Sequence, residues 1–211
     1  MIVTAGGKGS RIKEVEGEKP LIPVLGVPMI DWVLEAIMAS RGVGAVHVSI
    51  TSNTPRTEKH LRDRGIDVII TDGRGYSEDL NQVMSGLTSD HVMVLPADMP
   101  LIRPETIEDV LQQAAGMKVG SFCVTVPVEV MKALGLNLTY SLTVDGREVV
   151  LCGVSVVDRK AMLTGLELDQ AYMISESEEL ALNVNTIGDL RRAEMLLSRR
   201  LAHQGVAAQV R

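Results

Sequence analysis

A glycine-rich, cationic loop follows the first apolar run of the chain. After Met1-Ile2-Val3-Thr4, its residues are Ala5, Gly6, Gly7, Lys8, Gly9, Ser10 and Arg11. Glycine tolerates backbone angles that other residues resist, so successive N–H groups of such a loop can converge on an anion. Lysine and arginine add positive charge at the same place. The loop is therefore predicted to cradle phosphate groups, with an ordinary surface turn as the alternative.

Two common phosphate-binding motifs do not match this loop. The P-loop pattern G-x-x-x-x-G-K-[ST] fails on spacing, because Gly6 and Gly7 lie too close to Lys8. The dinucleotide-binding pattern G-x-G-x-x-G fits Gly7 and Gly9, but Ile12 occupies the position of its third glycine. The mismatch argues against an NAD-dependent oxidoreductase.

Polar residues stand at the ends of three expected strands. Asn53, Asp72 and Asp98 each close or follow an apolar, strand-like run. In open α/β sheets, ligands bind at the carboxyl ends of the strands. These three side chains and the glycine loop are therefore expected to gather at one edge of a sheet.

The loop and the later Lys19-Pro20-Leu21 resemble a family signature, A-G-G-x-G-[ST]-R followed by K-P-L. It is typical of nucleotidyltransferases with a glycosyltransferase-A-like sheet. The segments 52–57, 73–81 and 183–200 are similar to archaeal adenosylcobinamide-phosphate guanylyltransferases, which attach GMP to a corrinoid phosphate. Molybdenum-cofactor guanylyltransferases are the next most similar family. Other acceptors (molybdopterin, phospholactate or a sugar phosphate) and a non-catalytic nucleotide sensor stay open as alternatives.

The resemblance implies an electrostatic role for three charged side chains. Arg11 is expected to hold the β- and γ-phosphates of GTP, Lys19 to neutralise the α-phosphate, and Asp98 to bind Mg²⁺. An attacking phosphomonoester is already anionic, so no general base is needed, and fixed cations and N–H donors address the main barrier. For Asp98, a helix or turn cap is the alternative to a metal ligand.

The resemblance also assigns residues to the metal, the acceptor and the base. Many relatives supply a second carboxylate late in the chain, where this sequence has Asn183 and Asn185. We expect Asn185 to assist Asp98 at the metal, and Asn183 and Gly153 to face the acceptor, although Gly153 suits a bulge equally well. The full set expected to bind the nucleotide is Ala5, Gly6, Gly7, Lys8, Gly9, Ser10, Arg11, Lys19, Asn53, Asp72 and Gly75.

Three residues of that set are assigned to the nucleoside. Guanine carries an N1–H and an exocyclic amine, both of which need hydrogen-bond acceptors. Asp72 is predicted to accept from both, Asn53 to contact the base or the ribose, and Gly75 to let the backbone approach the base. Asp72 and Asn53 also suit ordinary turns.

Strand-like and helix-like segments alternate through residues 1–118. Strands are expected at 1–5, 45–51, 66–71 and 91–98, and helices begin near Pro28, Pro55 and Pro104, with one more around Leu80. This alternation predicts a mostly parallel, Rossmann-like sheet with helices on both faces, a three-layer α/β/α domain spanning 1–211.

The pattern changes in the second half of the chain. A strand is expected at 119–126, a hairpin turns at Asp145-Gly146, and a last strand ends in 182–186. Thr186 is predicted to cap a long final helix, with Asp189 completing a capping box. The core stripe of that helix is expected to contain Leu190, Ala193, Leu197 and Leu201.

The composition limits the classes of partner. A net charge of −6, a pI near 5.3 and 2 % aromatic residues argue against nucleic-acid binding. Cys123 and Cys152 have no metal-ligand spacing and are expected to be buried thiols. The absence of a signal-peptide pattern or a membrane-spanning apolar run predicts a cytoplasmic protein. Some of the eleven methionines could form a homodimer face, although core filling is the simpler explanation.

Overall fold

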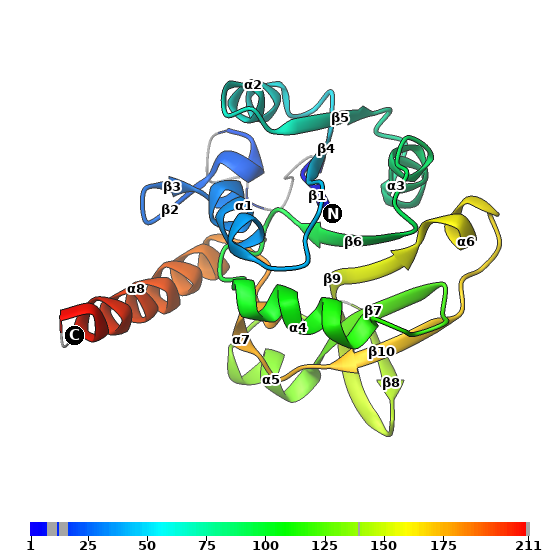
Figure 1. The fold of residues 1–211 in the computed structure, drawn as a ribbon. Helices are drawn as coiled ribbons and strands as arrows, with labels where there is room; N and C mark the ends of the chain where they lie inside the picture. Colours follow the sequence, from blue (N-terminus) through cyan, green and yellow to red (C-terminus); the bar gives the residue numbers. More distant parts are fainter. Residues whose placement is uncertain (8–11, 13–16, 139, 210–211) are drawn as a thin grey trace.

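The computed structural model describes residues 1–7, 12, 17–138 and 140–209 and shows a mixed α/β domain (Figure 1). Its main sheet has eight strands in the order β10-β7-β9-β6-β1-β4-β5, with β8 pairing to β9. The strands are β1 (Ile2–Thr4), β4 (His47–Thr51), β5 (Asp67–Thr71), β6 (His91–Pro96), β7 (Ser121–Pro127), β8 (Ser141–Val144), β9 (Arg147–Asp158) and β10 (Gln170–Ile174). The pairings β1·β4, β1·β6, β4·β5 and β7·β10 are parallel, whereas β9 runs antiparallel to both β6 and β7. The mostly parallel sheet is therefore confirmed.

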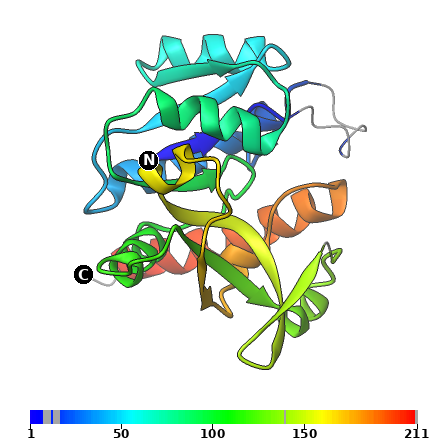
Figure 2. The same ribbon diagram turned by 90° about the vertical axis from the view of Figure 1, so that its right-hand side faces the viewer.

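Helices cover the two faces of the sheet unequally (Figure 2). On one face, Leu80, Val83 and Met84 of α3 (Tyr76–Ser85) pack against β1, β6 and β9, and α6 (Arg159–Leu163) adds Met162. The larger core lies on the other face. Its helices are α1 (Met29–Ala39), α2 (Pro55–Asp63), α4 (Pro104–Ala114), α5 (Val128–Ala133), α7 (Glu178–Ala181) and α8 (Ile187–Gln209).

Two short elements interrupt the chain between the first strand and the first helix. A 3₁₀ turn, η1 (Lys19–Leu21), is followed by a small hairpin of β2 (Pro23–Val24) and β3 (Val27–Pro28). Neither element is predicted by the sequence pattern. The indole of Trp32 in α1 donates to the carbonyl of Val24 over 3.0 Å, which ties the hairpin to the helix that follows it.

Local signals at two turns are confirmed. Asp145 and Gly146 have φ values of 49° and 78°, so the β8–β9 hairpin uses a turn with two left-handed residues. At the start of α8, the Asp189 carboxylate accepts from Thr186 N over 2.8 Å, and Thr186 Oγ1 accepts from Asp189 N over 3.1 Å. This reciprocal pair is the predicted capping box.

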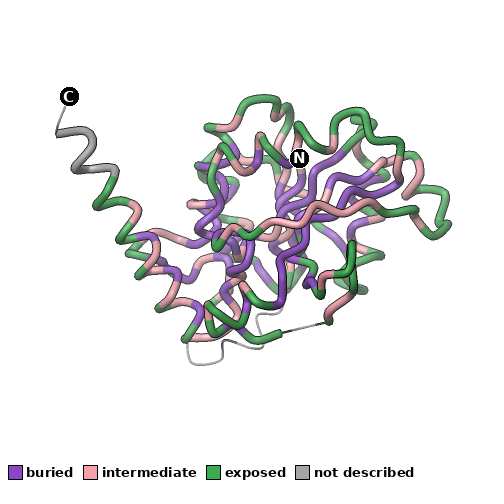
Figure 3. The backbone as a smooth tube through the Cα atoms, turned by 90° about the horizontal axis from the view of Figure 1, so that it is seen from below, coloured by how far each residue is buried: buried purple, intermediate pink, exposed green. Residues whose placement is uncertain are grey.

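Two expectations for the end of the chain are wrong. The last strand lies at Gln170–Ile174, and 182–186 has no strand, although Leu182 and Val184 are both fully buried. Alternate burial there imitates a strand, but the segment has no strand partner; Val184 N donates instead to the carbonyl of Asp98 over 2.9 Å. Leu201 is 41 % exposed because α8 extends away from the body of the domain (Figure 3).

Two further observations concern the cysteine thiols and the helices of the described residues. Cys123 and Cys152 are both buried and unbonded to one another, as expected. Burial raises the pKa of the Cys152 thiol to about 12, so it stays protonated at neutral pH. None of the helices in the described ranges is long and apolar enough to cross a membrane.

Candidate active site

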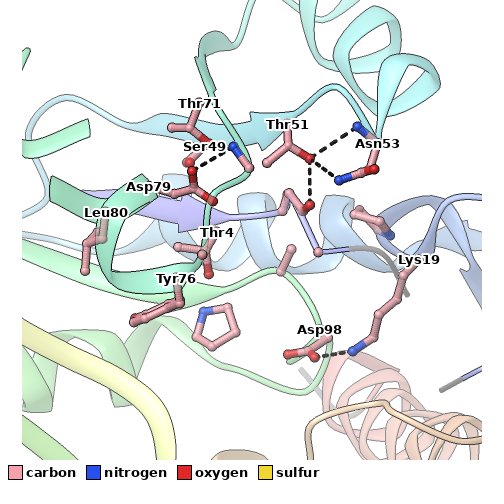
Figure 4. A pocket seen from close by; sticks show the side chains of 18 of the residues that line it. Thr4, Lys19, Ser49, Thr51, Asn53, Thr71, Tyr76, Asp79, Leu80 and Asp98 are labelled. Atoms are coloured by element: carbon pink, nitrogen blue, oxygen red, sulfur yellow. Dashed lines mark hydrogen bonds and ion pairs between the residues drawn. The ribbon is translucent and has the colours of Figure 1, made fainter. Parts of the chain in front are cut away.

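A cavity of about 360 Å³ opens at the carboxyl ends of β1, β4, β5 and β6, beside the first turn of α3 (Figure 4). Seven of the residues assigned to the site line it, whereas Asp72, expected at the same sheet edge, does not. These seven are Ala5, Gly6, Gly7, Lys19, Asn53, Gly75 and Asp98. Four other assigned residues, Lys8, Gly9, Ser10 and Arg11, lie outside the described residues.

Gly6 brings the end of β1 against the end of β4. A Cβ atom at Gly6 would lie 2.6 Å from Thr51 Cγ2, closer than real Cβ atoms approach, and 3.0 Å from Thr51 N, which is a tight contact. Thr51 Oγ1 donates to the carbonyl of Gly6 over 2.8 Å and accepts from the Asn53 amide over 2.9 Å. At Gly7, by contrast, a Cβ atom would have no neighbour within 4 Å. Gly6 is therefore needed for packing, while Gly7 leaves its backbone open toward the cavity.

At one end of the cavity, Lys19 joins two oxygen atoms from distant parts of the chain. Its ammonium forms an ion pair with Asp98 Oδ2 and donates to Asn185 Oδ1 over 2.9 Å. The side chains of Lys19 and Asp98 are only 16 % and 19 % exposed. Because the site is partly shielded from water, this ion pair is stronger than a surface pair.

Asp98 is also held from the segment before α8. Asn183 Nδ2 donates to Asp98 Oδ1 over 2.9 Å, and Asn185 Nδ2 donates to the carbonyl of Asn183 over 3.3 Å. The loop after β6 and the segment 183–185 therefore form one hydrogen-bonded unit. We call Lys19, Asp98, Asn183 and Asn185 the phosphate end of the cavity, after the role that the family resemblance implies for Lys19.

The phosphate end suits a divalent cation that keeps some of its own water. Asp98 Oδ2 and Asn185 Oδ1 both contact the Lys19 ammonium, so a carboxylate and an amide oxygen converge on one positive charge. Mg²⁺ prefers such a sparse oxygen set, completed by water and phosphate oxygens. Within the described ranges, no cluster of three or more His, Cys, Asp or Glu side chains could hold a metal ion by itself. The donor set thus fits Mg²⁺ bound together with a nucleotide.

Glu18 fixes the chain next to Lys19, and sequence reasoning missed it. Its carboxylate accepts from Arg56 N over 2.7 Å, and from Thr57 N and Thr57 Oγ1 over 2.6 Å each. These N–H groups belong to the first turn of α2, which favours a negative charge. This role is visible only in the folded chain, where Glu18 contacts a helix that begins at Pro55. In the sequence, Glu18 is simply one of several acidic residues in a charged stretch.

The opposite end of the cavity contains a different acid from the one expected. Asp72 does not line the cavity; it is exposed, and its carboxylate lies 3.2 Å from the guanidinium of Arg74. Asp79, in the first turn of α3, lines the cavity instead. Asp79 Oδ1 accepts from Gly73 N over 2.8 Å and from Arg74 N over 3.3 Å.

The two residues assigned to the acceptor lie at different places. Asn183 belongs to the phosphate end, while Gly153 does not line the cavity. Gly153 has a φ of 88°, and a Cβ there would lie 2.8 Å from Pro96 Cγ, on the cavity wall. The β7–β9 register shifts between Cys123 and Thr125, opposite Gly153, which supports the bulge interpretation.

The family model for the MobA-like NTP transferase domain matches residues 1–159, which include every residue that lines the cavity. The chain belongs to this family. It is 30 % identical over 207 residues to adenosylcobinamide-phosphate guanylyltransferase from Methanocaldococcus jannaschii, covering 94 % of this chain and 97 % of that protein. The bifunctional protein GlmU from Alkalilimnicola ehrlichii is 33 % identical over 118 residues, but the match spans only 25 % of its length.

Solved structures place this MobA-like domain in the same fold. CMP:2-keto-3-deoxy-manno-octonic acid synthetase in complex with CTP has a TM-score of 0.70 at 18 % identity, with 95 % and 98 % of the two chains covered. A nucleotidyl transferase from Methanothermobacter has a TM-score of 0.69 at 17 % identity, covering 94 % and 97 %. At these identities the likeness establishes the nucleotidyltransferase fold, and the family match establishes the enzyme class.

Proposed function

We propose that this nucleotidyltransferase transfers GMP from GTP to adenosylcobinamide phosphate, releasing pyrophosphate and forming adenosylcobinamide-GDP. One observation carries the proposal: the similarity to the Methanocaldococcus guanylyltransferase extends over nearly the whole of both chains, including the Asn183–Asn185 segment that binds Asp98. Similarity confined to the nucleotide half would leave the acceptor open. The match to GlmU covers only 55 % of this chain and therefore says less about the acceptor.

In the proposed reaction, an oxygen of the acceptor phosphate attacks the α-phosphorus of GTP. A new P–O bond forms, the bond between the α-phosphorus and the bridging oxygen breaks, and the electron pair leaves with pyrophosphate. Because the attacking phosphate is already anionic near neutral pH, no side chain has to remove a proton. The protein's task is to bring two anions together and to stabilise the charge that builds on the leaving group.

Lys19 is the described cation best placed for this task. Its ammonium lies at the cavity and is largely shielded from solvent, where a fixed positive charge acts more strongly than in water. Among the described residues, the amides of Gly6 and Gly7 make no hydrogen bond, so they are available to phosphate oxygens. Arg11 is proposed to add a second cation, as the family signature implies.

Mg²⁺ would be held by Asp98 and Asn185 and would supply a positive charge to the phosphate oxygens of GTP. With the cation bound there, Lys19 would contact the nucleotide instead of Asp98, because Asp98 Oδ2 and Asn185 Oδ1 are the oxygens that its ammonium contacts. Asn183 Nδ2 donates to Asp98 Oδ1, so Oδ2 is the carboxylate oxygen left for the cation.

An exposed part of β9 beside the cavity leaves room for a large acceptor. Leu151 on β9 is 43 % exposed, and Gly153 beside it is exposed next to Pro96, at the edge of the cavity. On this face α3 and α6 cover β1, β6 and the far end of β9, but not this part of it. A broad, partly apolar acceptor therefore has access to the phosphate end.

The test is to incubate the protein with GTP, Mg²⁺ and adenosylcobinamide phosphate and to follow the GDP-linked corrinoid by mass spectrometry. We expect product and stoichiometric pyrophosphate with GTP, and little with CTP or UTP. Lys19→Ala and heat-denatured protein are the negative controls. Tight GTP binding without product, with any phosphorylated acceptor supplied, would favour a nucleotide sensor instead.

A further inference from the structure

We propose that Asp79 is the residue that selects guanine, through the carboxylate oxygen that accepts from none of the described residues. This inference rests on the proposed function, because it names the group that reads the base of the donor nucleotide. It replaces Asp72, the acid that sequence position favours, with an acid from the first turn of α3.

The position of Asp79 in the cavity is the first argument. Two carboxylates line the cavity among the described residues, Asp98 and Asp79, and Figure 4 shows them on opposite sides of it. Asp98 is engaged by Lys19 and Asn183 at the phosphate end. A nucleotide whose phosphates lie at that end extends its base toward Asp79.

The hydrogen bonds of Asp79 are the second argument. Its Oδ1 atom accepts from two backbone amides, those of Gly73 and Arg74, whereas Oδ2 accepts from none of the described residues. The backbone therefore fixes the carboxylate and leaves one oxygen for a ligand. Gly73 and Gly75 make this possible, because their φ values of 70° and 143° turn the chain sharply between β5 and α3.

The chemistry of the free oxygen is the third argument. The other polar side chains at this end are mostly hydroxyls, namely Ser49, Thr51 and Thr71, which can both donate and accept. A carboxylate oxygen only accepts. Guanine presents two adjacent donors, N1–H and the amine on C2, whereas adenine has no donor at either position. An accept-only group thus distinguishes guanine where hydroxyls cannot.

Electrostatics favours the same assignment. GTP is highly anionic, so a negative side chain in its cavity weakens binding unless it meets donors of the ligand. Placing the acid at the end away from Lys19 limits the repulsion from the phosphates. A hydrogen bond to a charged acceptor then compensates for the desolvation of Asp79.

The test exchanges the free acceptor for a donor without disturbing the turn. In Asp79→Asn, the amide oxygen has to keep accepting from Gly73 N and Arg74 N, so its NH₂ group takes the position of Oδ2. This NH₂ would clash electrostatically with the guanine amine but would donate to the C2 oxygen of xanthine. We expect kcat/KM for GTP to fall roughly 10- to 100-fold and xanthosine triphosphate to become the better donor.

Two further variants make the result specific. Glu78→Gln, an exposed neighbour on α3 that does not line the cavity, is the matched control and keeps the GTP preference. Asp72→Asn tests the competing assignment. A gain of xanthosine triphosphate use in Asp79→Asn alone supports the inference. The same gain in Asp72→Asn, an unchanged GTP preference in Asp79→Asn, or an equal loss of both nucleotides in a folded Asp79→Asn protein overturns it.

Failure of the proposed function would be recognised separately. If the wild-type protein forms no corrinoid product, calorimetric titration of the nucleotides still compares GTP with xanthosine triphosphate on each variant. A reversal of binding preference in Asp79→Asn would support the inference with the acceptor reassigned, and an unreversed preference would refute it.

Discussion

The two ends of the cavity contain one carboxylate each among the described residues, and the two carboxylates differ in their hydrogen-bond partners. At the phosphate end, Asp98 forms an ion pair with the Lys19 ammonium and accepts a hydrogen bond from the Asn183 amide. At the opposite end, which we call the base end after the role proposed for Asp79, backbone amides fix one oxygen of Asp79, and the other oxygen accepts from none of the described residues. We expect a cation and a phosphate group to replace the contact between Lys19 and Asp98 when a nucleotide binds. The second oxygen of Asp79 is proposed to accept from the hydrogen-bond donors of the base.

The largest effect is expected from Asp98→Asn, which removes the charge at the phosphate end alone. Loss of this carboxylate should lower kcat by about 10³-fold, because both Lys19 and the bound cation lose their anionic partner. The preference for GTP over xanthosine triphosphate should stay unchanged. Product formation with each nucleotide, measured beside a thermal melt, checks both statements. A change of base preference in this variant would show that the two ends are not separate.

Gly6→Ala tests the close contact between the end of β1 and the end of β4 on the cavity wall. The added methyl would meet Thr51 Cγ2 at 2.6 Å, so β1 and β4 have to shift, at a cost of about 1–3 kcal/mol in the free energy of unfolding. Chemical denaturation measures the loss. Gly7→Ala is the matched control, since nothing lies within 4 Å of its Cβ position.

A second substitution sharpens the Gly6 experiment. In Gly6→Ala/Thr51→Ser the Cγ2 atom is absent while the hydroxyl that bonds to Gly6 is kept. Part of the lost stability should return relative to the sum of the single variants. Equal destabilisation by Gly6→Ala and Gly7→Ala would contradict the packing role assigned to Gly6.

The smallest effect is expected from Glu18→Gln, which acts on the phosphate end through the position of Lys19. The charge that binds the first turn of α2 is lost, so the free energy of unfolding should fall by about 1 kcal/mol. Because Lys19 is less well positioned, kcat should fall by roughly tenfold, with little change in KM. Glu35→Gln, an exposed acid on α1, provides the control.

A merely structural role for Glu18 would give a different result. Stability would then fall while kcat stayed at the wild-type value below the melting temperature. The conservative variant Glu18→Asp separates the cases further, since it keeps the charge but shortens the side chain that reaches Arg56 N and Thr57 N.

Local patterns in the sequence are enough to predict the sheet and the place of Lys19 and Asp98 at the cavity. Apolar runs separated by helical stripes predict alternating strands and helices, because each element must bury one face. Lys19 and Asp98 are identified from a signature and from a place at a strand end, both of which are short-range features. The same reasoning identifies the Asp145-Gly146 turn and the Thr186–Asp189 capping box.

Only the tertiary structure shows that Asp79, and not Asp72, lines the cavity, and which residues hold Lys19 and Asp98 in place. Asp72 and Asp79 are seven residues apart, and only the turn at Gly73 and Gly75 determines which carboxylate reaches the cavity. Glu18 binds a helix that begins 37 positions later, at Pro55. Segment 182–186 shows the alternate burial of a strand but instead packs on the loop after β6. The periodicity of apolar residues indicates which side chains are buried. Which distant segments they contact depends on how the whole chain folds in space.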